Sequence, residues 1–400
     1  MTPAVLTVVM CLAEVLGMAG TMTVPALLPV FIDDWALTTA QAGWLGGVAH
    51  LGYVLAVAVL LGLTDRLDSR AIYLWSTALT ALSCVGFALV ADGFWTALLF
   101  RALGGVGLAG TYMPGLRILS DHIPAGPLAS RCMSFYTASY GIGVAGSTLA
   151  AGLVADAMGW RAAAWLAAGL TLAALLLAAV LVPVTLPKHE GAPPTYRQLF
   201  DFRPVLRNRR AMGYILGYTA HNWELFGCRS WLVAFLAFAA GAPAGQVPGH
   251  ITALATIILL LGVPASILGN EAAVRWGRDR FLTAAMLTSA ACAAVIGFAA
   301  GLPYWAVAGL ALVYGVLITA DSASLTVGMV GAASAGRRGA AMAMHSLFGF
   351  GAAFVAPIVF GGAMEAAGGT GTVAGWGAGF LTLGVAVALG PLFLRVLGRS

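Results

Sequence analysis

Twelve long apolar runs divide the 400-residue sequence. Crossing about 30 Å of hydrocarbon takes roughly 20 predominantly apolar residues in a helix. A β-barrel would instead show strands of about ten residues with alternating polarity, a pattern that these runs lack. We therefore predict an all-α membrane protein. The predicted spans are Ala4–Val30, Gly43–Leu63, Ala71–Val90, Phe94–Leu116, Met133–Ala155, Ala162–Val184, Met212–Phe238, Ile251–Leu268, Phe281–Ala300, Tyr304–Ala320 with a continuation toward Met329, Ala340–Gly362 and Ala374–Leu394.

The composition excludes a soluble enzyme of this length. Hydrophobic residues make up 60% of the chain and charged residues 9%, whereas soluble domains average roughly 45–50% and 25%. The 20 Lys and Arg residues exceed the 15 Asp and Glu residues by only five, which disfavours a nucleic-acid-binding chain. The first run is too long for a cleavable signal peptide and carries Glu14, so we expect it to be a membrane span.

Basic residues gather in the loops that follow the even-numbered spans. These loops and the end of the chain hold 17 of the 20 Lys and Arg residues, whereas the other loops hold only Arg161 and several acidic residues. The positive-inside rule places the basic loops in the cytoplasm. We therefore expect both termini to be cytoplasmic.

The five cysteines are scattered singly and form no CxxC pair. They indicate neither a disulfide framework nor a metal site, and we expect small buried side chains. We predict no metal and no cofactor.

The chain consists of two halves with six predicted spans each. At an offset of 208 residues, Gly141 aligns with Gly349 and Arg70 with Arg278. Two six-span repeats joined by a long loop are typical of many secondary transporters, whose substrate site lies near the bilayer midplane between the halves. The predicted parts are an N-terminal six-helix bundle over 1–185, a cytoplasmic loop over 186–211 and a C-terminal six-helix bundle over 212–400.

The loop after span 2 reads LGLTDRLDSR over residues 61–70. Asp65, Arg66 and Arg70 match the motif G-x-x-x-D-R-x-G-R-R of the major facilitator superfamily, although its second glycine is replaced. Span 4 carries the arginine pattern of that family at Arg101. On these residues the chain resembles a bacterial transporter of the twelve-span type. The resemblance implies a monomeric multi-pass protein of the bacterial cell inner membrane that is not an enzyme.

The same resemblance implies a role for the loop motif. In the family, the motif carboxylate holds the cytoplasmic helix ends together in the outward-open state. Asp65 with Arg66 and Arg70 would then form a conformational latch rather than a substrate site. The alternative is that these residues are ordinary positive-inside anchors.

Five ionisable residues lie inside the predicted spans: Glu14, Arg101, Glu224, Arg229 and, nearer a span end, Asp321. An ionised side chain at the bilayer centre costs at least about 2.5–3.5 kcal/mol, so it usually faces a cavity or a partner. Glu14 and Glu224 lie about 15 Å and 18 Å along the first helix of each half, near the middle of the membrane. We expect the two carboxylates to face each other across a central cavity.

Span 7 carries a stripe of polar side chains. Tyr214, Tyr218, His221, Glu224 and Cys228 follow at spacings of 4, 3, 3 and 4 residues, which places them on one helical face. Such a stripe is expected beside water, although a hydrogen-bonded seam between helices is the alternative. We assign Tyr218, His221 and Glu224 to a substrate or proton pathway.

Four further residues complete the predicted pathway. Arg101 and Tyr112 share a face of span 4. Arg101 would serve as a counter-ion to Glu14, as a ligand for an anionic substrate, or as a salt bridge that only fixes packing. Arg229 lies on span 7, and His345 is the best candidate among the remaining histidines.

A methionine series along span 1 suggests a metal ion as an alternative substrate. Met10, Glu14, Met18 and Met22 recur every four residues, which would suit a soft-metal path for copper. The helical drift of about 40° per step argues against one straight ladder, and methionine is a common packing residue.

No nucleotide-binding motif occurs in the chain, so transport energy would come from a gradient. We predict alternating access for a small organic solute, with anions favoured by the arginines and protons coupled through Glu14 and Glu224. Proton-coupled efflux of drugs or metabolites is the alternative, with a copper or metal transporter less favoured. The expected partners are the solute, protons and the lipid bilayer, without nucleic acid.

Overall fold

The computed structural model describes residues 1–64, 67–124, 126–184, 202–334 and 337–398. Within these ranges the regular structure is helical and no strand occurs, which confirms the predicted fold class. Among these described residues, ten helical segments are long and apolar enough to cross a membrane. The count of twelve is not fully confirmed, because Pro3–Gly17 has only 15 residues and Arg209–Ala239, which carries Glu224 and Arg229, is not among the ten.

The chain forms two compact units, which we call unit 1 and unit 2. Unit 1 comprises Met1–Leu27 and Val48–Thr195, and unit 2 comprises Leu28–Gly47 and Tyr196–Ser400. A segment near the start of the chain therefore packs with the C-terminal helices. The boundaries at 185 and 212 stay a prediction.

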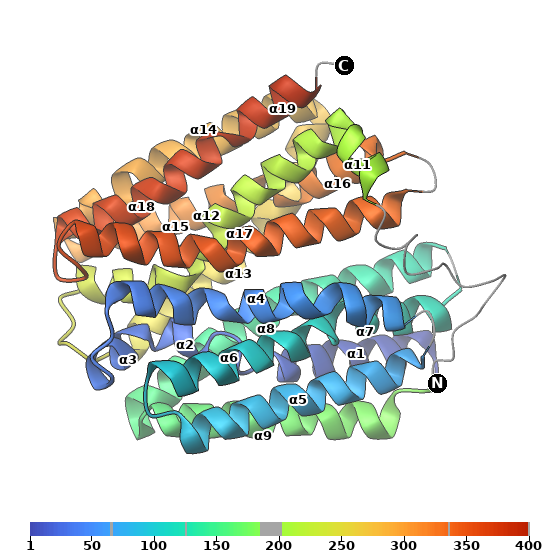
Figure 1. Ribbon diagram of the computed structural model, residues 1–400, viewed down its shortest axis with the longest axis horizontal. Coiled ribbons are helices and arrows are strands. Elements are labelled where there is room, and N and C mark those ends of the chain that lie inside the picture. The colour runs from blue at the N-terminus through green and yellow to red at the C-terminus, as the bar shows by residue number, and fades with distance from the viewer. Residues whose placement is uncertain (65–66, 125, 185–201, 335–336, 399–400) are drawn as a thin grey trace. The chain divides into compact units, whose positions relative to one another are not determined.

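In unit 1, α1 packs against α8 and α9, and α5 packs against α6 and α9 (Figure 1). A buried apolar cluster that includes Met10, Ile118 and Tyr136 joins α1, α7 and α8. The helices are α1 (Pro3–Gly17), α2 (Thr23–Ala26), α4 (Thr39–Leu63) from Val48 onward, α5 (Ser69–Val90), α6 (Phe94–Ala109), α7 (Tyr112–His122), α8 (Pro127–Met158) and α9 (Trp160–Leu181).

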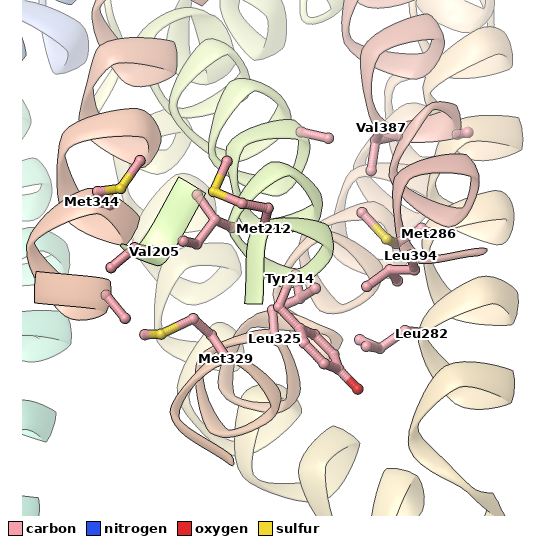
Figure 2. Packing of buried hydrophobic residues seen from close by; sticks show 14 residues of the cluster. Val205, Met212, Tyr214, Leu282, Met286, Leu325, Met329, Met344, Val387 and Leu394 are labelled. Carbon is pink, nitrogen blue, oxygen red and sulfur yellow. The ribbon is translucent and has the colours of Figure 1, made fainter. Parts of the chain in front are cut away.

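In unit 2, α12 is the central helix and packs against α16, α17, α18 and α19. Figure 2 shows how Met212, Met286, Met329 and Met344 from four helices fill the same core. The helices are α3 (Leu28–Asp34), the first part of α4, α11 (Arg203–Arg207), α12 (Arg209–Ala239), α13 (Gly249–Trp276), α14 (Arg278–Ile296), the 3₁₀ turn η1 (Phe298–Gly301), α15 (Tyr304–Ala320), α16 (Ser322–Ala332), α17 (Arg338–Ala366), α18 (Val373–Ala388) and α19 (Gly390–Gly398).

Predicted span 1 is not one continuous helix but the three helices α1, α2 and α3. Pro25 lies in α2 and has no backbone N–H, so the Thr21 carbonyl four residues earlier loses its helical donor. The sequence contains this proline, but the apolar run continues on both sides of it and therefore predicts one continuous helix. The break places polar backbone groups between α1 and α2.

Predicted spans 4, 10 and 12 are each made of two consecutive helices. Pro114 and Pro391 lie in the first turn after two of these breaks, where a missing N–H is tolerated. The break between α15 and α16 has no proline, and Asp321 stands at it. A charged residue therefore interrupts span 10.

Candidate functional site

Glu14 lies on α1 and is enclosed inside unit 1, with 1% of its surface exposed. The Tyr136 hydroxyl on α8 donates a hydrogen bond to Glu14 Oε2 at 2.8 Å. The same hydroxyl lies 3.3 Å from the Thr111 carbonyl. Glu14 Oε1 has no hydrogen-bond partner in the described residues. The carboxyl group therefore keeps an unused position for one more hydrogen bond.

Small and aromatic neighbours give Tyr136 its position. A methyl group at Gly115 would overlap the Tyr136 hydroxyl, so a glycine is needed where α7 passes this ring. Tyr112 stacks on Tyr136 with ring centroids 6.0 Å apart and meets Tyr140 edge-on at 5.2 Å. Of the predicted site residues, Tyr112 and Glu14 are thus joined through Tyr136, which the sequence reasoning missed.

Arg101 lies on α6 and is buried, with 8% of its surface exposed. Its Nη1 donates to the Thr21 carbonyl at 2.9 Å, which is the carbonyl that Pro25 leaves without a helical donor. Arg101 therefore replaces a missing backbone hydrogen bond.

Arg101 also lines a cavity of about 70 Å³ inside unit 1, together with hydroxyl-bearing and small residues. The buried Thr23 hydroxyl lines the same cavity and has no hydrogen-bond partner among the described residues. A water molecule needs only roughly 10–15 Å³ of such volume. The cavity can therefore accept water or a small anionic group beside the guanidinium.

Glu224 lies on α12 and has no exposed surface. Its Oε1 accepts hydrogen bonds from the Ser289 hydroxyl on α14 at 2.7 Å and from the Tyr314 hydroxyl on α15 at 3.1 Å. Glu224 Oε2 has no partner in the described part of the chain. Each of the two predicted carboxylates thus has its donors inside its own unit and one oxygen unused. That they face each other stays a prediction.

His221 lies one helical turn before Glu224 and is fully buried. Its Nδ1 lies 2.7 Å from Asp321 Oδ1, and both side chains are at most 3% exposed. The sequence identifies Asp321 as an intramembrane charge, but no spacing along the chain predicts its contact with His221.

The Tyr218 ring stacks on two histidine rings. It stacks on His345 of α17 with centroids 3.7 Å apart and on His221 at 5.7 Å. His345 Nε2 lies 3.3 Å from the Thr326 hydroxyl of α16. A methyl group at Gly349 would overlap Tyr218 and Asn222. The structure therefore brings the predicted residues Tyr218, His221 and His345 together.

Arg229 lies further along α12 than these rings. Its guanidinium carbon is 5.5 Å from the centroid of the Phe226 ring. It also lines a cavity of about 20 Å³ with Cys228 and Thr319. This cavity has room for about one water molecule.

Two of the three predicted latch residues, Asp65 and Arg66, lie outside the described residues. Arg70 Nη2 donates to the Ala179 carbonyl in the last turn of α9 at 2.6 Å. Arg278 Nη1 likewise donates to the Ser324 carbonyl at 2.7 Å. The two arginines are related by the 208-residue offset, but their acceptor carbonyls lie on α9 and α16, which this offset does not relate. The latch itself stays a prediction.

The spacing argument for a methionine ladder is wrong. Helix α1 ends at Gly17, so Met18 and Met22 do not continue the helical face of Met10. All three methionines are buried. No group of three or more His, Cys, Asp or Glu side chains in the described residues is arranged to hold a metal ion.

The fold and these buried groups define a class of protein. Apolar helices that enclose ionisable side chains are typical of membrane proteins with substrate or ion pathways. Residues 10–319 match the Major Facilitator Superfamily. The chain belongs to this family and is a multi-pass membrane protein.

Two curated relatives match part of the chain. It is 26% identical over 134 residues to the niacin transporter NiaP of Acinetobacter baylyi. The aligned region covers 34% of this chain and 30% of the relative. The chain is 28% identical over 135 residues to a putative metabolite transport protein of Haemophilus influenzae, which covers 34% and 33%. The match thus spans about a third of each relative's length.

Solved structures of transporters share the fold along the whole chain. One is a bacterial homologue of the human lysosomal transporter Spinster, in an inward-facing and occupied conformation, with a TM-score of 0.78 at 14% identity. The match covers 100% of this chain and 98% of the homologue. The nucleoside transporter NupG has a TM-score of 0.76 at 14% identity, with 99% of both chains covered. At this identity the likeness shows the fold alone.

Proposed function

We propose that the protein moves a small organic anion across the bacterial inner membrane by alternating access, driven by protons. Both termini would be cytoplasmic and the functional unit a monomer. The observation that carries the proposal is the pair of carboxyl groups on α1 and α12, Glu14 and Glu224. Each is buried among helices and has one oxygen without a hydrogen-bond partner in the part of the chain that the structure describes. Such groups in membrane helices are typical of proton relays.

The arginines support an anionic substrate. Arg101 and Thr23 both line the cavity in unit 1, and the Thr23 hydroxyl has no hydrogen-bond partner among the described residues. A guanidinium beside a hydroxyl suits a carboxylate group. The relative named a niacin transporter supports the same choice, because niacin is a small aromatic carboxylic acid. In this proposal the positive charges of Arg101 and Arg229 stabilise negative charge in the substrate or proton pathway. Tyr112, Tyr218, His221 and His345 line this pathway.

Transport by the purified protein in liposomes tests the proposal. The probes are radiolabelled nicotinate and benzoate, a neutral nucleoside and a cationic dye, each with imposed pH gradients of both directions. We expect nicotinate or benzoate to accumulate with the gradient, and Glu14→Gln and Glu224→Gln to remove this dependence. A proton-driven export of the dye would instead favour drug efflux. If the uptake of every probe is independent of the imposed pH gradient, proton coupling is contradicted.

We also propose that Arg70 forms the latch with Asp65 and Arg66. The bond from Arg70 to the Ala179 carbonyl supports this role, because it joins the start of α5 to the end of α9.

A further inference from the structure

In each unit, a break in one membrane segment lies against an ionisable side chain. In unit 1 the break between α6 and α7 contains Thr111, whose carbonyl shares the Tyr136 hydroxyl with Glu14. In unit 2 the break between α15 and α16 contains Asp321, whose carboxylate meets His221. Both units thus have a helix break beside a buried ionisable side chain, with different partners.

Asp321 belongs both to the break and to the buried pair. It is the residue that ends α15 and precedes α16. Its own carbonyl accepts the first helical hydrogen bond of α16 from Leu325 N at 3.0 Å. Its carboxylate oxygen lies 2.7 Å from His221 Nδ1 on α12. Any change in the charge of this pair therefore acts directly on the residue at which the two helices separate.

Polar contacts hold the other side of the break. Ser266 on α13 accepts a hydrogen bond from the Ala323 backbone N–H at 3.2 Å. The Ser324 hydroxyl donates to Asn270 Oδ1 at 3.4 Å. The first turn of α16 is thus attached to α13, and Asp321 attaches the break to α12.

The titratable and charged groups near the pair come from α12, α14, α15 and α17. Asp321 interacts electrostatically with Glu224, and His221 with His345. Tyr218 on α12 stacks on the His221 ring, and His345 on α17 stacks on Tyr218. Glu224 lies one turn after His221 and accepts from Tyr314 on α15. Arg278 on α14 donates to the Ser324 carbonyl in the first turn of α16.

We propose that the His221–Asp321 pair is a proton-binding centre, separate from Glu224, that holds the break in span 10. A proton from solution adds to the free imidazole nitrogen electron pair of neutral His221, and the imidazolium then attracts the Asp321 carboxylate. When this proton returns to solution, the attraction is lost and the break is released. The inference rests on the proposed proton coupling and adds Asp321 and the α15–α16 break to it.

Infrared difference spectroscopy tests proton binding without any substrate. The full-length protein in lipid is compared between acidic and neutral buffer. We expect histidine-ring and carboxylate bands that are lost in both His221→Asn and Asp321→Asn. The matched control is Glu271→Gln with Arg275→Gln, an exposed ion pair of 2.9 Å, which keeps these bands. If the bands persist in both single variants, the pair does not bind the proton and the proposal is wrong.

Uptake of radiolabelled nicotinate into liposomes tests the role of the pair in coupling. Each single variant leaves one buried charged or polar partner behind, so we expect a lower Tm and at least about a tenfold loss of gradient-driven uptake. The double variant His221→Asn with Asp321→Asn removes both charges and should recover Tm but not gradient-driven uptake. Recovery of gradient-driven uptake in the double variant would show that the pair is only a packing contact.

The two proposals fail in distinguishable ways. If the wild-type protein accumulates none of the probes with a pH gradient, the proposed function is wrong, and the infrared result still decides whether the pair binds a proton. If a single variant does not fold, the folded double variant supplies both measurements.

Discussion

At the scale of single residues, Arg101 shows how one missing backbone donor positions a buried charge. Pro25 removes an N–H from α2, and the carbonyl of Thr21 then accepts from Arg101. A buried carbonyl without a partner costs about 1–3 kcal/mol. The proline and the arginine are thus coupled across 76 positions of the sequence that separate them.

This coupling makes a prediction for a double-variant cycle. Arg101→Gln should lower the free energy of unfolding by about 1–3 kcal/mol and reduce anion uptake, because the Thr21 carbonyl and the cavity both lose the guanidinium. Adding Pro25→Ala should recover part of the stability by restoring the backbone donor, but not the uptake. Thermal unfolding and liposome uptake measure the two effects. Recovery of uptake with stability would contradict an anion-binding role.

A second prediction at this scale concerns Gly349. Gly349→Ala should lower the free energy of unfolding by about 1–3 kcal/mol, because the added methyl group overlaps Tyr218 and Asn222. Gly351→Ala on the same helix is the matched control, since no atom outside its own helix lies within 4 Å of its added methyl group. Thermal unfolding measures both variants. Equal effects would mean that the Tyr218 stack adapts freely.

The candidate site could be predicted only in part at the residue scale. The cost of ionised groups in lipid singled out Glu14, Arg101, Glu224 and Asp321, all of which are buried, and Arg229, which is half-buried. Their partners could not be predicted, because Tyr136, Ser289 and Tyr314 lie on other helices, and no spacing along the chain reports contacts between distant helices.

At the scale of helices, α4 shows how a helix is fixed to distant parts of the chain. Glu365, which lies in the last turn of α17, accepts a hydrogen bond from the Thr39 hydroxyl at 3.1 Å and from Ala40 N at 3.0 Å. Methyl groups at Gly43 or Gly47 would overlap the backbone of Pro357 or Phe354. The first part of α4 therefore packs in unit 2, although its sequence belongs to the first half.

Removing the carboxylate at the start of α4 tests this contact. Glu365→Ala should lower the free energy of unfolding by about 0.5–2 kcal/mol, the usual cost of losing an N-terminal cap. Glu365→Gln keeps an acceptor oxygen and should lose only the charge contribution of about 0.3–1 kcal/mol. Glu271→Ala is the control on an exposed residue. Denaturant unfolding measures the series, and equal losses for Ala and Gln would show that the hydrogen bonds contribute nothing.

At the scale of the whole molecule, the distribution of charge predicts the orientation in the membrane. Ser334 lies in a predicted cytoplasmic loop and Thr370 in a predicted external loop. In whole cells, Thr370→Cys should react with a membrane-impermeant maleimide, and Ser334→Cys only after permeabilisation. The wild-type chain, with its native cysteines, is the control. The reverse labelling pattern would invert the topology.

The sequence by itself determined the helical membrane fold, because every apolar run must satisfy its backbone hydrogen bonds within itself. It also singled out four ionisable residues that are buried, Glu14, Arg101, Glu224 and Asp321, since lipid does not tolerate such groups on its side of a helix. Only the tertiary structure decided where spans 1 and 10 break and which groups meet there. Those outcomes depend on contacts such as Arg101 with the Thr21 carbonyl and His221 with Asp321, which form between helices far apart in the sequence.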